Sequence, residues 1–355
     1  MRAVVYDSFG APPVVTEIER PQCPPHGAVI KVEATGVCRS DWHGWLGHDP
    51  DITVPHVPGH EFAGTVAELG AEVTEIAGTA AVGPGTRVTA PFVCGCGTCE
   101  VCACGDHQVC PNQTQPGFTH PGSFAEYVVV HHADVNLVPL PDDIDAITAA
   151  GLGCRFATAY RAVVAHGRVR PGMSVAVHGC GGVGLAAVMI AAAHGAEVVA
   201  VDISEAALDL AREFGAAHTE LPPSASRLVE RGGVHVSIDA LGRIDTFADA
   251  IAGLRRRGRH VQVGLLVGTE ARPPVDMAAV IGRELEIVGS HGMAAHDYPP
   301  MLAEIAVGRL DPRRLVTNVI SLDEAPAALM AMSHGSTPGT TVVDLSASHS
   351  DRGAW

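Results

Sequence analysis

Four cysteines lie close enough along the chain to bind one metal ion. Their spacing is C-x2-C-x2-C-x7-C, and they are Cys96, Cys99, Cys102 and Cys110. Four thiolates within one short segment are typical of a closed, tetrahedral structural zinc site. Iron–sulfur clusters use similar runs of cysteine and are the competing interpretation. The neighbouring Cys94 and Cys104 also allow C-x-C pairs, so the spacing alone leaves the set of ligands open.

A second segment has the pattern of a phosphate-binding turn. The sequence G-x-G-x-x-G runs from Gly179 to Gly184, between a predicted strand at Ser174–His178 and a predicted helix at Val183–His194. Gly179 allows the tight turn, Gly181 lets the backbone approach a pyrophosphate, and Gly184 lets helix and strand pack closely. The N-terminus of the helix adds free N–H groups and a partial positive charge. We therefore predict that a dinucleotide binds here, with backbone contacts from Gly179, Gly181, Gly182 and Gly184.

An acidic residue follows at the position that selects the dinucleotide. Asp202 comes directly after the predicted strand Glu197–Val201. A carboxylate there accepts hydrogen bonds from the adenosine ribose and repels a 2′-phosphate. No arginine follows before Arg212, so the sequence favours NAD over NADP. The competing interpretation is a purely structural strand–turn–helix with an aspartate on the surface.

Three widely separated residues offer metal ligands of another kind. Cys38 and Cys154 offer thiolates, and His60 offers an imidazole. Two cysteines and one histidine with an open fourth position are typical of a catalytic zinc site. The spacing itself does not connect these positions, because a buried cysteine is usually a small apolar residue and this chain has 19 histidines.

The order of these motifs resembles the medium-chain, zinc-dependent alcohol dehydrogenase family. The resemblance extends over nearly the whole chain and rests on the four-cysteine run, the glycine-rich turn and the segments Cys38-Arg39-Ser40-Asp41, Gly59-His60-Glu61 and Gly122-Ser123-Phe124-Ala125-Glu126-Tyr127. It implies an α/β protein with a GroES-like, β-rich catalytic domain and a doubly wound, parallel Rossmann domain. We expect the catalytic domain at residues 1–155 and 290–355 and the Rossmann domain at residues 156–289, with a zinc ion in the cleft between them. The resemblance also favours zinc over an iron–sulfur cluster at the four cysteines.

The resemblance implies roles for single residues near the metal. The implied ligands of the catalytic zinc are Cys38, His60 and Cys154. Asp41 resembles the group that hydrogen-bonds the ligand histidine and fixes its tautomer. Glu61 resembles a carboxylate that approaches the metal when ligands exchange. Ser40 resembles the hydroxyl that takes the substrate proton, which then passes along the ribose to His43 near the surface.

The resemblance also implies contacts with the cofactor and the substrate. Arg39 resembles a pyrophosphate contact, and Thr158 and Val183 resemble contacts on the nicotinamide side. Phe92 resembles a residue that lines the substrate pocket. Trp45 would either narrow that pocket or serve ordinary packing.

Three features bear on how this chain differs from its relatives. The segment Gly339–Val342 has no basic residue where one often reaches the cofactor phosphates. The segment from Glu75 to Gly85 is slightly enlarged, which predicts a larger surface turn. Polyol dehydrogenases of the superfamily often have glutamate at the position of Cys154 and often lack the cysteine run, so we expect a simple alcohol or aldehyde substrate rather than a sugar alcohol.

The remaining sequence predicts the elements that position these residues. Before residue 150, short β-branched runs alternate with glycine and proline, which predicts strands at Ala28–Val32, Phe62–Glu68, Arg87–Thr89 and Ala125–Val130. After residue 150, strands alternate with helices, which predicts a parallel sheet. Besides those around the turn, the predicted elements there are a helix at Glu205–Phe214 and strands at Val234–Asp239, His260–Gly264 and Leu285–Gly289. The last part predicts helices at Pro300–Ala306 and Asp323–Met332 and a strand at Thr341–Leu345.

Composition limits the classes of partner. The 355 residues carry a formal net charge of −16, so nothing in bulk neutralises the phosphates of nucleic acids or anionic membranes. The longest apolar run, Leu185–Ala193, is too short to cross a bilayer, and no signal peptide is visible. We expect a cytoplasmic protein whose cysteines are ligands or thiols rather than disulfides. A homodimer or homotetramer is implied by the resemblance alone.

The sequence therefore predicts a zinc-dependent alcohol dehydrogenase that transfers hydride reversibly between a primary or secondary alcohol and NAD+. We expect two zinc ions per subunit, one catalytic and one structural; the catalytic ion would lower the pKa of the bound alcohol. One alternative is a zinc-free quinone or enoyl reductase of the same superfamily that uses NADPH, but it would not need Cys38, His60 or the four cysteines. Another is a catalytically silent zinc- or dinucleotide-binding protein, which would not need a proton exit through Ser40 and His43.

Overall fold

The computed structural model describes residues 1–73, 82–335 and 338–346, and the chain forms two compact units. The first unit comprises Met1–Ala157, Gly292–Val307 and Asp311–Trp355, and the second comprises Thr158–His291 and Gly308–Leu310. Residues 74–81 lie outside the described residues, and they include positions 75–81 of the predicted larger surface turn from Glu75 to Gly85. None of the helices in the described ranges is long and apolar enough to span a bilayer.

The first unit is built on a seven-stranded sheet with a two-stranded sheet beside it. The order of the large sheet is β14-β15-β3-β4-β5-β7, β6 also pairs with β3, and β1 pairs with β2. The pair β14–β15 is parallel and the others are antiparallel. The strands are β1 (Arg2–Val5), β2 (Val14–Glu17), β3 (Ala28–Val37), β4 (Phe62–Leu69), β5 (Arg87–Thr89), β6 (Tyr127–Val130), β7 (Val138–Pro139), β14 (Val316–Ser321) and β15 (Thr340–Asp344).

Short helices connect these strands. The α-helices of the first unit are α1 (Arg39–Trp45), α2 (Glu100–Ala103), α3 (Ala133–Asn136), α4 (Ala146–Ala150), α11 (Tyr298–Ala306) and α12 (Ala325–Ala331). Its 3₁₀ turns are η1 (His107–Val109), η5 (Ala295–Asp297), η6 (Pro312–Leu315), η7 (Leu322–Glu324) and η8 (Met332–His334), and its π-helical turn is η2 (Leu152–Phe156).

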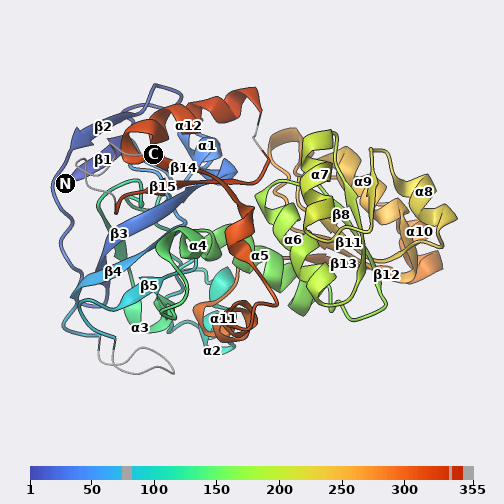
Figure 1. Ribbon diagram of the computed structural model, residues 1–355, viewed down its shortest axis with the longest axis horizontal. Coiled ribbons are helices and arrows are strands. Elements are labelled where there is room, and N and C mark those ends of the chain that lie inside the picture. Colours follow the sequence, from blue (N-terminus) through green and yellow to red (C-terminus); the bar gives the residue numbers. More distant parts are fainter. Residues whose placement is uncertain (74–81, 336–337, 347–355) are drawn as a thin grey trace. The chain divides into compact units, whose positions relative to one another are not determined.

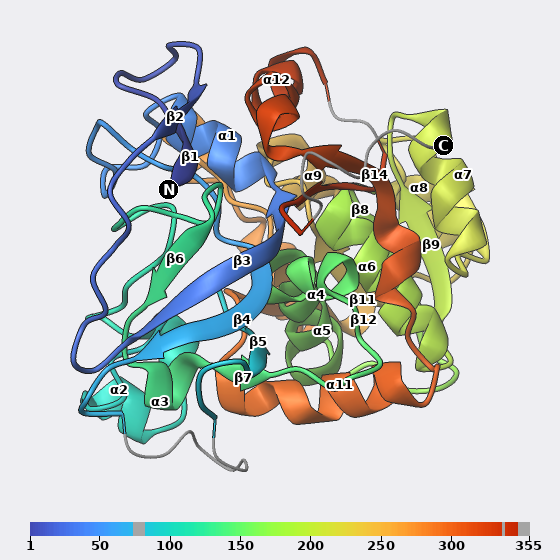
Figure 2. The same ribbon diagram turned by 60° about the vertical axis from the view of Figure 1, so that its left-hand side comes forward.

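Strand β3 is the central element of the first unit and positions two of the predicted metal ligands. Most of its residues are buried, because it pairs with β4, β6 and β15. It ends directly before Cys38, and β4 begins directly after His60 and Glu61. Since β3 and β4 are antiparallel, with Thr35 opposite Phe62, the end of one strand lies beside the start of the other (Figure 2). The pairing therefore brings residue 38 to residues 60 and 61.

The third predicted ligand, Cys154, lies in a helical segment that packs against these strands. Helix α4 contacts both β3 and β4, and its first turn is capped by the side chain of Asp145, which accepts a hydrogen bond from the backbone N–H of Thr148. The chain then widens into the π-helical turn η2, where the hydroxyl of Tyr298 donates to the carbonyl of Leu152 at 3.2 Å. Such turns are rare and often occur at functional sites.

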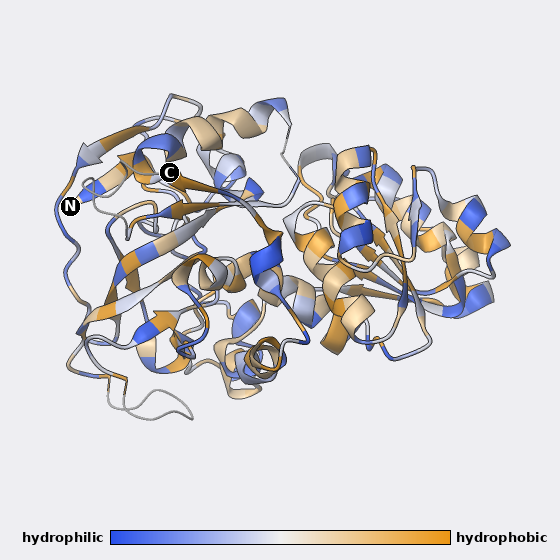
Figure 3. Ribbon diagram, in the orientation of Figure 1, coloured by the Kyte–Doolittle hydropathy of each residue, from blue (hydrophilic) through white to orange (hydrophobic). Residues whose placement is uncertain are grey.

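The second unit is a parallel sheet of six strands with helices on both faces. The order is β10-β9-β8-β11-β12-β13, and every pair is parallel. Figure 1 shows α6 and α7 on one side of this sheet and α8, α9 and α10 on the other, and Figure 3 shows apolar residues concentrated on the strands between them. The strands are β8 (Ser174–His178), β9 (Glu197–Val201), β10 (His218–Glu220), β11 (Val234–Asp239), β12 (Leu254–Gln262) and β13 (Glu286–Gly289). The helices are α5 (Ala157–Arg161, which begins in the first unit), η3 (Ala162–His166), α6 (Gly182–Ala193), α7 (Glu205–Glu213), α8 (Ala225–Glu230), α9 (Ile244–Ala252), η4 (Gly268–Glu270) and α10 (Met277–Arg283).

The predicted α/β architecture of a β-rich part and a parallel, doubly wound part is confirmed. Two strands of the parallel sheet differ from the prediction. Strand β12 begins at Leu254, whereas the prediction began at His260. The first half of the strand was missed because it carries three exposed arginines and has no apolar pattern. Strand β10 was not predicted, since its three residues are half-buried and polar.

Candidate functional site: two metal-binding clusters and a dinucleotide turn

The ligand atoms of Cys38, His60, Glu61 and Cys154 all lie within 4.8 Å of one another. Cys38, His60 and Glu61 are buried, whereas Cys154 is partly accessible. The structure therefore brings together the three residues that the resemblance implies as ligands, although they are far apart in the sequence. The geometry matches a Cys2His metal site with a carboxylate beside it.

The ring of His60 is oriented by Asp41 on helix α1. Nδ1 of His60 lies 2.8 Å from Oδ1 of Asp41, and the same carboxylate accepts hydrogen bonds from the backbone N–H groups of Gly59 at 3.0 Å and Cys38 at 2.9 Å. The Nδ1–H group therefore donates to Asp41, and Nε2 is directed away from it. Nε2 is buried and has no hydrogen-bond partner in the described part of the chain. A buried nitrogen without a partner is costly unless a ligand occupies it, and a metal ion would satisfy this one.

The ionisable groups of this cluster shift one another's pKa values. The neighbouring Cys154 lowers the pKa of the Cys38 thiol well below its usual value, while the contact with Cys38, together with burial, raises the pKa of Cys154. Burial lowers the pKa of His60, but the carboxylate of Asp41 and the side chain of Cys38 raise it by more. The pKa of His60 is therefore well above its usual value. A divalent cation would favour the thiolate form of both cysteines, because it compensates two negative charges at once.

Glu61 is held by a residue that the sequence did not indicate. The backbone N–H and Nε of Arg155 donate to Oε1 of Glu61 at 2.9 and 3.0 Å, and Nη2 donates to Oε2. Burial raises the pKa of the Glu61 carboxyl, and the Arg155 guanidinium opposes that shift. The only sequence signal for Arg155 is a charged residue within the apolar run around Cys154, and such a signal does not identify the partner.

The four-cysteine run forms a second cluster. The sulfur atoms of Cys96, Cys99, Cys102 and Cys110 lie within 4.8 Å of one another, and none of them is in a disulfide. The backbone N–H of Cys96 donates to Sγ of Cys110 at 3.4 Å, and that of Cys102 donates to Sγ of Cys99 at 3.4 Å. Hydrogen bonds from the backbone and hydroxyl of Thr98 lower the pKa of Cys96 to about 5. The cluster is a closed set of four thiols.

The two other nearby cysteines are not part of this cluster. Cys94 is buried and donates to the carbonyl of Pro91 at 3.5 Å, and Cys104 is exposed at the end of α2. The structure therefore separates the four cysteines from the C-x-C pairs that the spacing had left open.

In the second unit, the glycine-rich turn has the backbone geometry that was predicted. Gly179 has φ of +87°, a conformation that favours glycine, and a Cβ atom on Gly184 would lie 1.7 Å from the carbonyl oxygen of Gly179. A Cβ on Gly181 would meet nothing within 4 Å, so the backbone there is open to a ligand. Gly182 and Val183 begin helix α6, whose free N–H groups point at this opening.

Asp202 is fixed at the edge of the same turn. Its Oδ2 accepts a hydrogen bond from the backbone N–H of Cys180 at 2.6 Å, and its Oδ1 accepts one from Ser204 at 2.8 Å. The carboxylate therefore has a defined position beside the turn. Its binding to a ribose stays a prediction.

The predicted proton route lies on helix α1. Ser40 and His43 are three residues apart and share one face of that helix. Nδ1 of His43 is 3.0 Å from Nδ1 of His48, a residue that was not predicted. Burial, with the nearby His48 and Arg39, lowers the pKa of His43.

The predicted cofactor contacts Arg39 and Thr158 have different surroundings in the structure. Arg39 donates to the carbonyl of Met332 at 2.7 Å and lies 4.8 Å from the ring of Trp42. The hydroxyl of Thr158 is buried and has no hydrogen-bond partner in the described residues. Neither observation tests the cofactor contact that the resemblance implies for these two side chains.

Two aromatic residues flank His60. The ring centroids of Phe92 and Phe118 lie 6.1 and 5.3 Å from that of His60, and Phe118 was not predicted. Trp45 is 6% exposed in a core cluster with Phe118, and its indole N–H donates to the carbonyl of Ala11 at 2.6 Å. Trp45 therefore packs in the core of the first unit, and its contribution to a substrate pocket stays a prediction.

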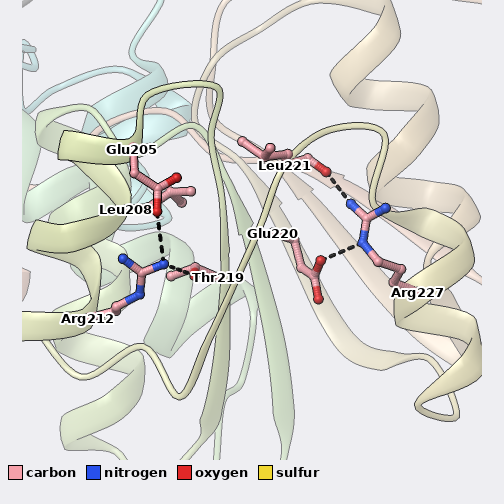
Figure 4. A pocket seen from close by; sticks show the side chains of 7 residues that line it. All are labelled: Glu205, Leu208, Arg212, Thr219, Glu220, Leu221 and Arg227. Carbon is pink, nitrogen blue, oxygen red and sulfur yellow. Dashed lines mark hydrogen bonds and ion pairs between the residues drawn. The ribbon is translucent and has the colours of Figure 1, made fainter.

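One pocket of about 340 Å³ lies elsewhere in the second unit, between α7, β10 and α8. Figure 4 shows Arg212 directed toward Glu205 and Thr219, and Arg227 directed toward Glu220 and the carbonyl of Leu221. Both guanidinium groups are thus compensated within the chain, and no predicted site residue lines this pocket.

Comparison with known proteins relates both units to dehydrogenases. Residues 24–142 match the family model for the alcohol dehydrogenase GroES-like domain, and residues 182–307 match that for zinc-binding dehydrogenase. An alcohol dehydrogenase of Geobacillus stearothermophilus is 32% identical over 97% of this chain and 99% of its own length. A sorbitol dehydrogenase of Halalkalibacterium halodurans is 30% identical over 94% of this chain and 97% of its own. The solved structure of the alcohol dehydrogenase TADH from Thermus sp. ATN1 superimposes with a TM-score of 0.87 at 30% identity, covering 97% of this chain and 99% of that one.

Proposed function

The chain belongs to the medium-chain zinc-dependent alcohol dehydrogenase family, and on that premise we propose that it oxidises a primary or secondary alcohol reversibly with NAD+. Membership of this family identifies the chain as an oxidoreductase of the zinc-dependent type. The alcohol substrate and the preference for NAD are what we propose. The observation that carries the proposal is the buried Nε2 of His60, which accepts no hydrogen bond from the described residues and lies beside the thiols of Cys38 and Cys154.

The residues of the first cluster have separate tasks in this reaction. Cys38, His60 and Cys154 would hold a zinc ion, which when bound supplies a Lewis acid that lowers the pKa of an alcohol. Asp41 keeps Nδ1 of His60 protonated and so leaves Nε2 for the metal. Ser40 accepts the proton of the substrate hydroxyl while it gives up its own hydroxyl proton, and His43 passes a proton on to solvent.

The second cluster would hold a structural zinc. Its four sulfur ligands leave no position open for a substrate, so it contributes to stability rather than to the reaction. Two zinc ions per subunit are therefore expected.

The preference for NAD over NADP is supported by Asp202. Two backbone N–H groups hold its carboxylate in place, so it presents a fixed negative charge to the 2′ position of a bound dinucleotide. A 2′-phosphate would be repelled there, whereas ribose hydroxyls can donate to the remaining lone pairs.

A second copy of the chain is the proposed protein partner, and we expect it at the β13 edge of the parallel sheet. In the described residues β13 pairs only with β12, so its other edge is free for pairing. Large apolar side chains are exposed in this strand and in the segment that precedes it in the chain, namely Ile287 in the strand and Val275, Met277 and Ile281 before it. A free edge with exposed apolar residues favours self-association. We place the homo-oligomer in the cytoplasm, as the sequence suggests.

The substrate class is proposed on the basis of the ligand set. Relatives named sorbitol and L-threonine 3-dehydrogenase align with this chain, so identity alone does not select a substrate. Cys154 and the complete four-cysteine cluster favour a simple alcohol over a sugar alcohol.

Zinc analysis together with the absorbance of NADH tests the proposal. The wild-type protein is expected to hold two zinc ions per subunit and to reduce NAD+ with at least one primary, secondary or aromatic alcohol. Cys154→Ser is expected to hold one zinc and to be inactive. Full activity with two zinc ions in that variant would show that Cys154 is not a ligand.

A further inference from the structure

Arg155 and Glu61 form a buried ion pair directly beside the proposed zinc ligands. The Glu61 side chain is fully buried, and that of Arg155 is 9% exposed. Oε1 of Glu61 accepts two hydrogen bonds from Arg155, one from its backbone and one from Nε, and Oε2 accepts a third from Nη2. Nη1 of Arg155 donates to the carbonyl of Val37 at 3.3 Å. The guanidinium is thus anchored to the end of strand β3, and both carboxylate oxygens are occupied.

The space for this pair is provided by strand β3. A Cβ atom at Gly36 would lie 2.3 Å from Oε2 of Glu61 and 2.7 Å from Nη2 of Arg155. The backbone N–H of Gly36 also donates to the carbonyl of Glu61 at 2.7 Å. Strand, carboxylate and guanidinium therefore fit together only where residue 36 has no side chain.

Without Arg155, the same carboxylate has a clear alternative partner. An oxygen of Glu61 lies within 4.8 Å of the ligand atoms of Cys38, His60 and Cys154. A buried carboxylate that loses its cation is strongly destabilised and moves toward the next positive charge. In the zinc-loaded protein that charge is the metal ion, and carboxylates are good zinc ligands.

We propose that Arg155 is a positioning residue that holds Glu61 away from the catalytic metal and so keeps the fourth coordination position open for the substrate. The charges agree with this arrangement, because two thiolates balance a divalent ion and Arg155 balances Glu61. The inference rests on the proposed function in that it requires zinc at Cys38, His60 and Cys154.

The binding of imidazole to the zinc-loaded protein tests the openness of the fourth position without use of the reaction. In Arg155→Gln, Glu61 is expected to occupy that position, so the affinity for imidazole should fall by about tenfold or more while zinc is retained. In the double variant Glu61→Gln/Arg155→Gln no carboxylate competes, and the imidazole affinity should return to the wild-type value. Arg313→Gln, at an exposed arginine paired with Asp145, is the matched control and should bind imidazole as the wild type does.

Two results would overturn the inference. One is an Arg155→Gln protein with wild-type affinity for imidazole. The other is a protein that loses zinc and does not regain imidazole binding when Glu61 is also replaced, since that pattern indicates a role in packing only. If Arg155→Gln does not fold, Arg155→Lys is the alternative variant, because lysine keeps the charge but cannot hold both oxygens of Glu61. The double variant Glu61→Gln/Arg155→Lys should then bind imidazole more tightly than Arg155→Lys does. Equal affinities of these two proteins for imidazole would contradict the inference. A wild-type protein with one zinc per subunit would instead refute the proposed function.

Discussion

Nδ1 of His60 lies 2.8 Å from Oδ1 of Asp41, and both side chains are fully inaccessible to solvent. Asp41 belongs to helix α1, which begins directly after Cys38. His60 and Glu61 are the two residues that precede strand β4. One carboxylate thus joins the segments that carry two of the three proposed zinc ligands, because it also accepts the backbone N–H of Cys38. Asp41 therefore fixes the orientation of the proposed metal site.

Replacement of Asp41 is therefore expected to weaken the catalytic zinc site. Asp41→Ala removes the partner of Nδ1 and the acceptor of two backbone N–H groups, so the affinity of this site for zinc should fall about 10- to 100-fold. Asp41→Asn keeps the shape of the side chain and should lose less. Equilibrium competition with a chelator measures both, and the four-cysteine site in the same protein should keep its zinc. An unchanged zinc affinity in Asp41→Ala would contradict the proposed orientation of His60.

The positions that the sequence identified and the ones that it missed differ in a physical way. The four cysteines and the glycine-rich turn are local patterns, so their chemistry can be derived from spacing. Cys38, His60 and Cys154 meet only because β3 pairs with β4 and α4 packs on both strands, and no spacing rule contains that pairing. Their assignment depended on family resemblance.

Arg155 was not foreseen because its role depends on a partner that is distant in the sequence. A charged residue in an apolar run indicates a buried ion pair, but Glu61 was one of many acidic residues that could have been that partner. His48 was missed for a related reason, since its contact with His43 forms across the C-terminal end of α1. Strand β10 has too few apolar residues to be recognised from periodicity.

Asp202→Gly is expected to shift the cofactor preference toward NADP. The change removes hydrogen bonds from a charged acceptor to the ribose and also removes the repulsion of a 2′-phosphate, so kcat/KM for NAD+ should fall about 10- to 100-fold while that for NADP+ rises. Steady-state kinetics with both dinucleotides measure the change. Glu205→Gln, which neutralises a nearby acid in the first turn of α7, should leave the preference unaltered. If Asp202→Gly keeps the wild-type ratio, Asp202 does not select the cofactor.

Ile281→Lys is expected to weaken self-association. Ile281 is 72% exposed on α10, the helix that precedes β13 in the chain, and a lysine there would place charges into the proposed apolar contact between two copies. Light scattering after size-exclusion chromatography should give a smaller mass for this variant than for the wild type at the same concentration. Val307→Lys is a matched control, because Val307 is 78% exposed in the first unit. Equal masses for wild type and Ile281→Lys would show that this face does not form the contact.

Acid is expected to destabilise the first unit through His120, a half-buried side chain whose neutral form is favoured in the fold. Nε2 of His120 lies 3.2 Å from the carbonyl of Val129, and Nδ1 lies 3.0 Å from the hydroxyl of Thr119, so one nitrogen donates and the other accepts. Burial lowers the pKa of His120 to about 4, and the nearby His131 and His56 add to the shift. The unfolded chain has the ordinary histidine pKa of about 6.5 and therefore binds more protons between these two values. The stabilising contribution is complete above pH 6.5 and is lost as the pH falls toward 4.

His120→Gln isolates this effect, because the amide can donate to Val129 and accept from Thr119 but does not titrate. The two proteins should have similar stability at pH 7, whereas at pH 5 the wild type should have lost about 2 kcal/mol more than the variant. Urea unfolding at pH 7, 6 and 5 measures the difference. Protonation of the zinc ligands affects both proteins equally and cancels in the comparison. If the two curves of stability against pH run parallel, His120 does not contribute to the acid sensitivity of the fold. His178, whose pKa burial lowers to about 4, is then the next histidine to test by the same substitution.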